Sequence, residues 1–131
     1  MATRTASCNC GQLQAKVAGE PTRVSVCHCD ACQRRTGSAF AIQARFPKEA
    51  VHITGRGTEF VRVNDEGGRG RFTFCPMCGS TVFYVVERRE ELIAIPVGAF
   101  ADPCFPAPTV SVYEEHMHPW VSLPDNIEHI N

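Results

Sequence analysis

The arrangement of the eight cysteines constrains this chain more than any other feature of its sequence. Seven of them fall into three close groups, and only Cys104 stands alone. The groups are Cys8-x-Cys10, Cys27-x-Cys29-x-x-Cys32 and Cys75-x-x-Cys78. Closely spaced thiols suit chelation of a metal ion, whereas the cysteines of a disulfide framework are usually spread along the chain. The grouping therefore favours metal sites over a disulfide framework.

Two of the groups supply pairs that fit one metal ion. On an extended strand, residues i and i+2 point to the same face, so Cys8 and Cys10 can offer both sulfurs to one ion. The stretch Cys75-Pro-Met-Cys78-Gly79 is typical of a knuckle, in which glycine adopts a positive φ and backbone N–H groups point at the sulfurs. We therefore predict a closed, structural site formed by Cys8, Cys10, Cys75 and Cys78. Four thiolates select zinc or an iron–sulfur centre.

The third group, Cys27, Cys29 and Cys32, has one ligand too few for a closed tetrahedral site. Three protein ligands and one open position are the pattern of a catalytic zinc. His28 is expected to point away, because it lies between two ligands on a strand. Three alternatives stay open: Cys104 completes the set, a histidine completes it, or the thiols bind no metal stably and act as a redox pair. The other candidate histidines are His52, His116, His118 and His129.

The rest of the sequence indicates an all-β fold of short strands. Apolar residues alternate with period two in "QLQAKVAG" (12–19) and "AFAIQARF" (39–46), while in "EFVRV" (59–63) the phase of the alternation is open. Nearly continuous apolar runs at 81–87 and 92–98 predict central strands, and Pro96 predicts an edge or the end of the second one. The stretch "DACQRR" (30–35) predicts a short helical turn capped by Asp30.

Length and composition narrow the class of protein. The chain has 131 residues, which predicts a single domain over 1–131, and a formal net charge of −1, which gives no general attraction to nucleic acid or to membranes. No apolar run approaches the roughly 18 residues of a transmembrane helix. The first residues, "MATRTASCNCGQ", show no secretory signal, so we expect a reducing, cytoplasmic location.

Three motifs together resemble those of the glutathione-dependent formaldehyde-activating enzyme family, which also contains relatives of centromere protein V. They are "SCNCG" (7–11), "VCHCDACQRRTGSAF" (26–40) and "FTFCPMCGSTVFY" (72–84), and the resemblance extends over roughly residues 5 to 123. It implies a β-tent of small antiparallel sheets pinned by two zinc ions. The four-cysteine set would hold the structural zinc, and Cys27, Cys29 and Cys32 would hold a second, catalytic-type zinc.

The same resemblance implies a reaction. The family's enzyme adds glutathione to formaldehyde, giving S-(hydroxymethyl)glutathione, and is classed as a carbon–sulfur lyase. Three thiolate ligands already donate negative charge, so we expect nearby cations to stabilise an incoming thiolate. Arg34 and Arg35 follow the second motif and are predicted to bind the carboxylates of the thiol, with Arg69 and Arg71 as further candidates.

Two other functions are also compatible with these residues. The first is an enzymatically silent zinc-binding module for a thiol metabolite or a protein partner. The second is redox or metal sensing through the same thiols. Outside the cysteine groups, residues 102–124 carry five of the nine prolines and predict an irregular tail. In that tail we expect Trp120 to pack on the core and Cys104 to be a buried apolar residue.

Overall fold

The computed structural model describes residues 1–130, and it is built almost entirely of short strands, as the alternation in the sequence predicted. Its one α-helix, α1, spans Asp30–Thr36. The strands are β1 Thr3–Ser7, β2 Gln14–Ala18, β3 Arg23–Cys27, β4 Ala41–Pro47, β5 Val51–Thr54, β6 Thr58–Val63, β7 Arg69–Phe74, β8 Thr81–Val86, β9 Leu92–Pro96, β10 Val110–Val112 and β11 Glu128–Ile130. Four 3-10 turns span Lys48–Ala50, Glu87–Arg89, Val97–Phe100 and Glu114–His116.

The strands form two sheets. A small antiparallel sheet has the order β1-β2-β5, and a larger one has the order β11-β10-β3-β4-β9-β8-β7-β6. The larger sheet is mixed, because β10 runs parallel to both β3 and β11. The expectation of purely antiparallel sheets is therefore wrong for this edge. The segment after Phe105 passes beside β3 in the same direction, and this parallel pairing gives part of the predicted tail a regular structure.

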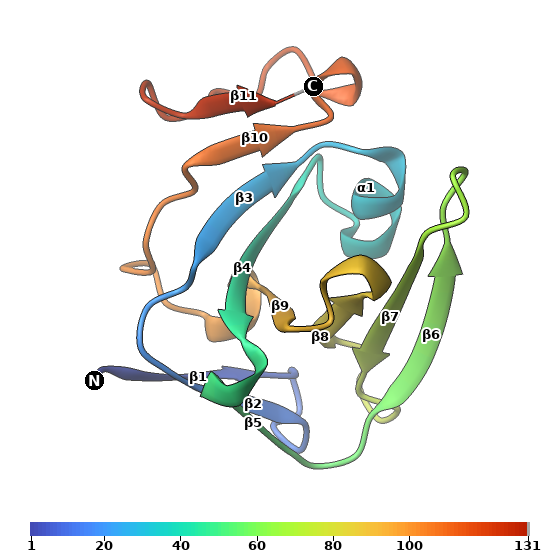
Figure 1. The fold of residues 1–131 in the computed structure, drawn as a ribbon, viewed down its shortest axis with the longest axis vertical. Coiled ribbons are helices and arrows are strands. Elements are labelled where there is room, and N and C mark those ends of the chain that lie inside the picture. The colour runs from blue at the N-terminus through green and yellow to red at the C-terminus, as the bar shows by residue number, and fades with distance from the viewer. Residues whose placement is uncertain (131) are drawn as a thin grey trace.

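The larger sheet opens into two arms. Strands β8 and β9 are paired through Tyr84 and Ala94. On one side of this junction lie β9, β4 and β3, and on the other lie β8, β7 and β6. Figure 1 shows α1 in the space between the two arms, close to the ends of β3 and β4. The three-cysteine group is thereby placed opposite the β6–β7–β8 arm.

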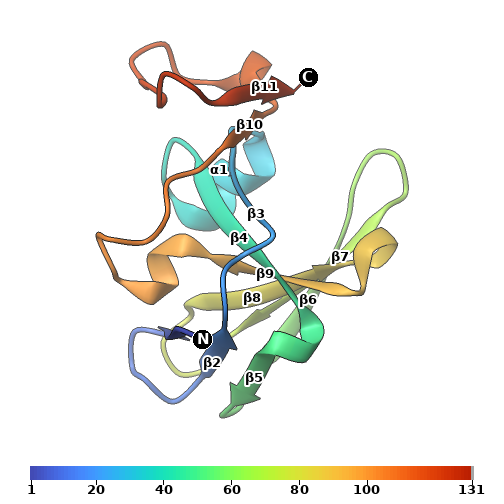
Figure 2. The same ribbon diagram turned by 60° about the vertical axis from the view of Figure 1, so that its left-hand side comes forward.

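The core lies where the small sheet packs against the larger one, and Figure 2 shows β2 and β5 on the far side of β8 and β9 from α1. Ala15 and Val17 of β2 belong to the same buried cluster as Phe46 of β4 and Ile95 of β9. The buried residues of β2 are Ala15 and Val17, as the alternation in residues 12–19 predicted. Cys8 and Cys75 belong to the same buried cluster, so a metal site at these residues is joined directly to the core.

Pro96 is the last residue of β9, which has a neighbour on each side, so the proline ends a central strand. Within residues 1–130, no helix is long and apolar enough to cross a membrane.

Candidate metal centres

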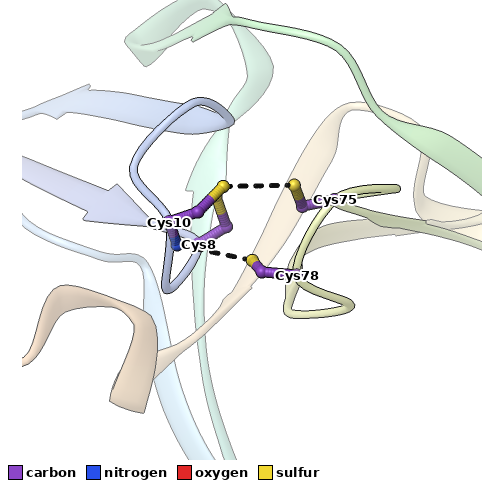
Figure 3. A group of neighbouring side chains, drawn as sticks. All are labelled: Cys8, Cys10, Cys75 and Cys78. Atoms are coloured by element: carbon purple, nitrogen blue, oxygen red, sulfur yellow. Dashed lines mark hydrogen bonds between the residues drawn. The ribbon is translucent and has the colours of Figure 1, made fainter.

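The four-cysteine group forms where two turns meet. Cys8 and Cys10 follow β1, and Cys75 and Cys78 lie in the turn between β7 and β8 (Figure 3). The sulfurs of Cys8 and Cys10 are 3.6 Å apart, and those of Cys10 and Cys75 are 3.7 Å apart. All four sulfurs lie within 4.8 Å of one another. The structure thus brings together the four residues that the spacing had paired.

Backbone geometry in the β7–β8 turn matches the predicted knuckle. Gly79 has a φ of 82°, a conformation that L side chains rarely adopt, and its N–H donates to the carbonyl of Cys75 at 2.8 Å. The N–H of Met77 points at the sulfur of Cys75, and the N–H of Cys10 points at that of Cys78. Hydrogen bonds from Ser80 and Cys10 lower the pKa of the Cys78 thiol to about 5. These donors favour the thiolate form that metal binding requires.

Gln12 adds a side-chain donor to this group, which the sequence did not suggest. Its Nε2 atom donates to the sulfur of Cys75 at 2.9 Å and to the carbonyl of Arg56 at 2.7 Å, while its Oε1 atom accepts from the N–H of Arg56. Gly55 allows this approach, because a Cβ atom there would lie 1.8 Å from the carbonyl oxygen of Gln12. The loop before β6 is thereby tied to the cysteine group.

The geometry of this group fits one tetrahedral ion. Four sulfurs at about 2.3 Å from a common centre would be about 3.8 Å apart, close to the separations of 3.6 Å and 3.7 Å given above. Cys8 and Cys75 are buried, and backbone N–H groups already point at their sulfurs. The group could therefore hold a metal ion without rearrangement of its backbone.

The three-cysteine group forms at the junction of β3 and α1. Cys27 is the last residue of β3 and is buried, while Cys29 and Cys32 lie at the start of α1 and are half-buried. Their three sulfurs lie within 4.8 Å of one another, so this group could also hold a metal ion. The cap of α1 is Cys29 rather than the predicted Asp30, because the Cys29 sulfur accepts the N–H of Cys32 at 3.4 Å. Cys29 is therefore both a candidate metal ligand and the N-cap residue of α1.

The three thiols are electrostatically unequal. Hydrogen bonds from the thiols of Cys27 and Cys32, and from the backbone of Cys32 and Ala31, lower the pKa of the Cys29 thiol to about 2. Bonding to Cys29 and Cys32, together with burial, raises the pKa of Cys27. These contacts favour the thiolate form of Cys29 and the neutral form of Cys27.

Among residues 1–130, no fourth cysteine, histidine or carboxylate joins this group within the same 4.8 Å limit. Cys104 is exposed and belongs to neither group, so the expectation that it is buried is wrong. His28 is buried and points to Ser111 of β10, with Nε2 and Oγ 3.0 Å apart. His129 lies beside Glu114, and His52 is exposed on β5.

His116 and His118 meet α1 without joining the cysteine group. His116 Nδ1 lies 3.2 Å from Asp30, and His118 Nε2 donates to Gln33 Oε1 at 2.8 Å. The amide of Gln33 donates in turn to the carbonyls of His28 and His116. The two histidines thus fix the tail to α1 rather than supply a fourth ligand. Trp120, next to His118, is 71% exposed, so the expectation that it packs on the core is wrong.

The two arginines after the motif lie in different surroundings. Arg35 is half-buried, and its Nη2 atom lies 4.0 Å from the sulfur of Cys32. Its guanidinium carbon is 5.3 Å from the ring centre of Phe72 and 5.4 Å from that of Tyr84. Arg34 is exposed. Arg71 forms ion pairs with Glu59 and Glu90, and Arg69 is exposed.

A cavity of about 520 Å³ lies between α1 and the β6–β7–β8 arm. Cys29 and Cys32 line it, together with Arg34 and Arg35, whereas Arg69 and Arg71 do not. Sequence reasoning missed the opposite wall, which comprises Phe60, Arg62, Phe72, Phe74, Gly79 and Thr81. Phe72 and Phe74 lie two residues apart on β7 and share a face, but nothing in the local sequence shows that this face is opposite the cysteines.

Three comparisons place the chain among known proteins. A family model described as "Glutathione-dependent formaldehyde-activating enzyme" matches residues 3–116. No curated protein matches the chain. Among solved structures, the chain is similar to a Rhodobacter sphaeroides protein whose crystal structure was a structural genomics target. That similarity has a TM-score of 0.59 and 20% identity, and it covers 76% of this chain and 91% of the other. At this identity the likeness supports the fold alone.

Proposed function

This chain belongs to the glutathione-dependent formaldehyde-activating enzyme family, and on that premise we propose that it is a zinc-dependent enzyme of the carbon–sulfur lyase type. It would act on adducts between a thiol and an aldehyde, as in the formation of S-(hydroxymethyl)glutathione. The reactive centre would be the group of Cys27, Cys29 and Cys32. The four-cysteine group would hold a second, structural zinc.

One observation carries this proposal more than any other. Cys29 and Cys32 lie in the wall of the 520 Å³ cavity, so a molecule in the cavity can reach their metal position. Within residues 1–130, that position has three protein ligands within reach and lacks a fourth. A three-ligand zinc site beside a cavity is the arrangement used for catalysis, whereas a closed four-ligand site is used for stability.

The donor set of the reactive centre fits zinc. Three thiolates are soft ligands, which zinc accepts in tetrahedral geometry. When bound there, zinc would supply a position at which a substrate thiol loses its proton near neutral pH. Because three thiolates outweigh the charge of a Zn²⁺ ion, a fourth thiolate needs positive charge nearby. Arg35, 4.0 Å from the sulfur of Cys32, would provide it.

The reaction itself forms a carbon–sulfur bond and an O–H bond, and it breaks the S–H bond of the thiol and the π bond of the carbonyl. The thiol sulfur bonds to the aldehyde carbon, the π electrons of the carbonyl move to its oxygen, and the proton lost by the thiol ends on that oxygen. The reverse reaction breaks the carbon–sulfur bond, which defines the lyase class. In this scheme Cys27, Cys29 and Cys32 hold the metal, and Arg34 and Arg35 orient the acidic thiol through its carboxylates.

Exchange NMR tests the proposal directly. Glutathione and formaldehyde form their adduct without a catalyst, so the rate must be compared with and without zinc-loaded protein at known occupancy. We expect faster exchange with the native chain and the background rate with Cys29→Ser. Cys104→Ser is the matched control, because Cys104 is exposed and lies outside both groups. No acceleration by the fully loaded native protein would reject this substrate pair.

A further inference from the structure

The cavity wall opposite the cysteines is an aromatic surface built by strand register. Phe60 of β6 is paired with Phe72 of β7, and Phe74 lies two residues further along β7, so all three rings share one face. Phe72 also stacks on Tyr84 of β8, with ring centres 4.6 Å apart. Phe60 is 59% exposed although it lines the cavity. A molecule in the cavity would therefore bury apolar ring surface.

Apart from the cysteine sulfurs, the charged side chains that line the cavity are all positive. Arg34 and Arg35 come from α1, and Arg62 comes from β6, about 7 Å along the same strand face from Phe60. No aspartate or glutamate is among the lining residues that the structure describes. The cavity is thus complementary to an anion attached to an apolar body, and it offers no carboxylate partner for an ammonium group.

A second, more polar hollow shares Arg35, Gly79 and Thr81 with the cavity, and it is lined by hydroxyl groups that include those of Thr5, Ser7 and Thr36. Neither Cys29 nor Cys32 lines it. A ligand whose sulfur reaches the three-cysteine group therefore places the part of its body nearest the sulfur in the aromatic cavity.

We infer that the thiol of this site carries an aromatic or apolar body and a carboxylate, and that the site prefers it to glutathione. The inference rests on the proposed function, because it takes the three-cysteine group as the place of the thiol. Glutathione has a polar peptide body and an ammonium group, which this cavity does not match. An aromatic thiol acid would lay its ring on Phe60 and Phe72 and extend its carboxylate to an arginine.

Four thiols test separately the preference for an aromatic ring and the preference for a carboxylate. 4-(Mercaptomethyl)benzoate has both the ring and the carboxylate. Benzyl mercaptan has the ring alone, 3-mercaptopropionate has the carboxylate alone, and glutathione is the family's expected substrate. Their dissociation constants for the zinc-loaded protein would be measured by calorimetry, without aldehyde. We expect 4-(mercaptomethyl)benzoate to bind about tenfold more tightly than each of the other three.

Two substitutions on the exposed strand β6 assign the preference to this cavity. Phe60→Ser should abolish the advantage over 3-mercaptopropionate, and Arg62→Gln should reduce the advantage over benzyl mercaptan, because Arg34 and Arg35 still line the cavity. Val61→Ser is the matched control, because Val61 lies on the same strand but points to its opposite face. It should leave all four dissociation constants unchanged. Retention of the preference in both cavity variants would overturn the assignment.

Adduct exchange, measured in parallel, separates this inference from the proposed function. If glutathione binds as tightly as 4-(mercaptomethyl)benzoate and its exchange is accelerated, the inference is overturned and the proposed function stands. If the aromatic thiol binds selectively but no thiol's exchange with formaldehyde is accelerated, the ligand class is supported and the proposed function fails.

Discussion

Arg35 Nη2 lies 4.0 Å from the sulfur of Cys32, one turn earlier on the same short helix. The guanidinium group is also held over the rings of Phe72 and Tyr84, across the cavity from α1. A positive charge is thus fixed beside the three-cysteine group by contacts on both sides. This placement distinguishes Arg35 from its exposed neighbour Arg34. Replacement of Arg35 is therefore expected to change the rate of thiol–aldehyde exchange.

Arg35→Gln should lower kcat/KM for thiol–aldehyde exchange by about tenfold, equivalent to about 1.4 kcal/mol of transition-state stabilisation. The physical reason is the loss of positive charge next to the developing thiolate. Arg35→Lys should have a kcat/KM between those of Arg35→Gln and the native chain, because lysine keeps the charge but not the planar stacking. Arg69→Gln, at an exposed position outside the cavity, should leave the rate unchanged. Equal rates for Arg35→Gln and the native chain would remove Arg35 from the account.

Cys75→Ser should abolish the cooperative unfolding transition. A structural zinc site contributes about 10–16 kcal/mol, which matches or exceeds the roughly 5–15 kcal/mol stability of a typical domain. Cys75 is also part of the buried core, so the loss extends to the contact between the two sheets. Thermal unfolding followed by circular dichroism checks this, with Cys104→Ser as the control. A native-like transition in Cys75→Ser would show that the four-cysteine site is dispensable.

Gln12→Ala should weaken metal retention at the four-cysteine group by about tenfold to a hundredfold, since it removes a donor that orients a ligand. The amide now donates to Cys75 at 2.9 Å and joins the backbone of Arg56. Competition with a chromogenic chelator measures the change. Gln14→Ala, in the neighbouring strand β2, serves as the control. Unchanged retention in Gln12→Ala would mean that the bond to Cys75 does not matter for binding.

Gln33→Ala should lower the free energy of unfolding of the metal-loaded protein by about 1–3 kcal/mol, because three hydrogen bonds of its amide are lost. These bonds join α1 to the carbonyls of His28 and His116 and to the ring of His118. Denaturant titration measures the loss, and Arg34→Ala on the same helix is the reference. A difference of zero between the two variants would show that the tail does not hold α1 in place.

Features set by short spacings were predictable from the sequence. The division of seven cysteines into four and three was predicted from neighbours at most three residues apart, and the structure places both groups as predicted. The knuckle was predictable for the same reason, because Gly79 needs a positive φ wherever such a turn forms. The buried phase of β2 followed from a clean alternation of apolar and polar residues.

Features set by distant pairing were not predictable. In β6 every residue is exposed, and apolar side chains lie on both faces. The alternation in the sequence therefore could not show whether Phe60 or Val61 lies on the face that lines the cavity. Pairing with Phe72 of β7 decides it, and this pairing places Phe60 and Arg62 in the cavity. Gln12 was missed for a similar reason, because its partner Cys75 lies 63 residues away.

The central claim is that the two cysteine groups have different tasks, one for stability and one for chemistry. Native mass spectrometry of zinc-loaded Cys29→Ser tests it most directly, because one spectrum reports both the number of bound ions and the compactness of the chain. The account predicts a compact chain with one zinc, compared with two for the native protein. An expanded charge-state distribution in Cys29→Ser, or two retained zinc ions, would contradict it.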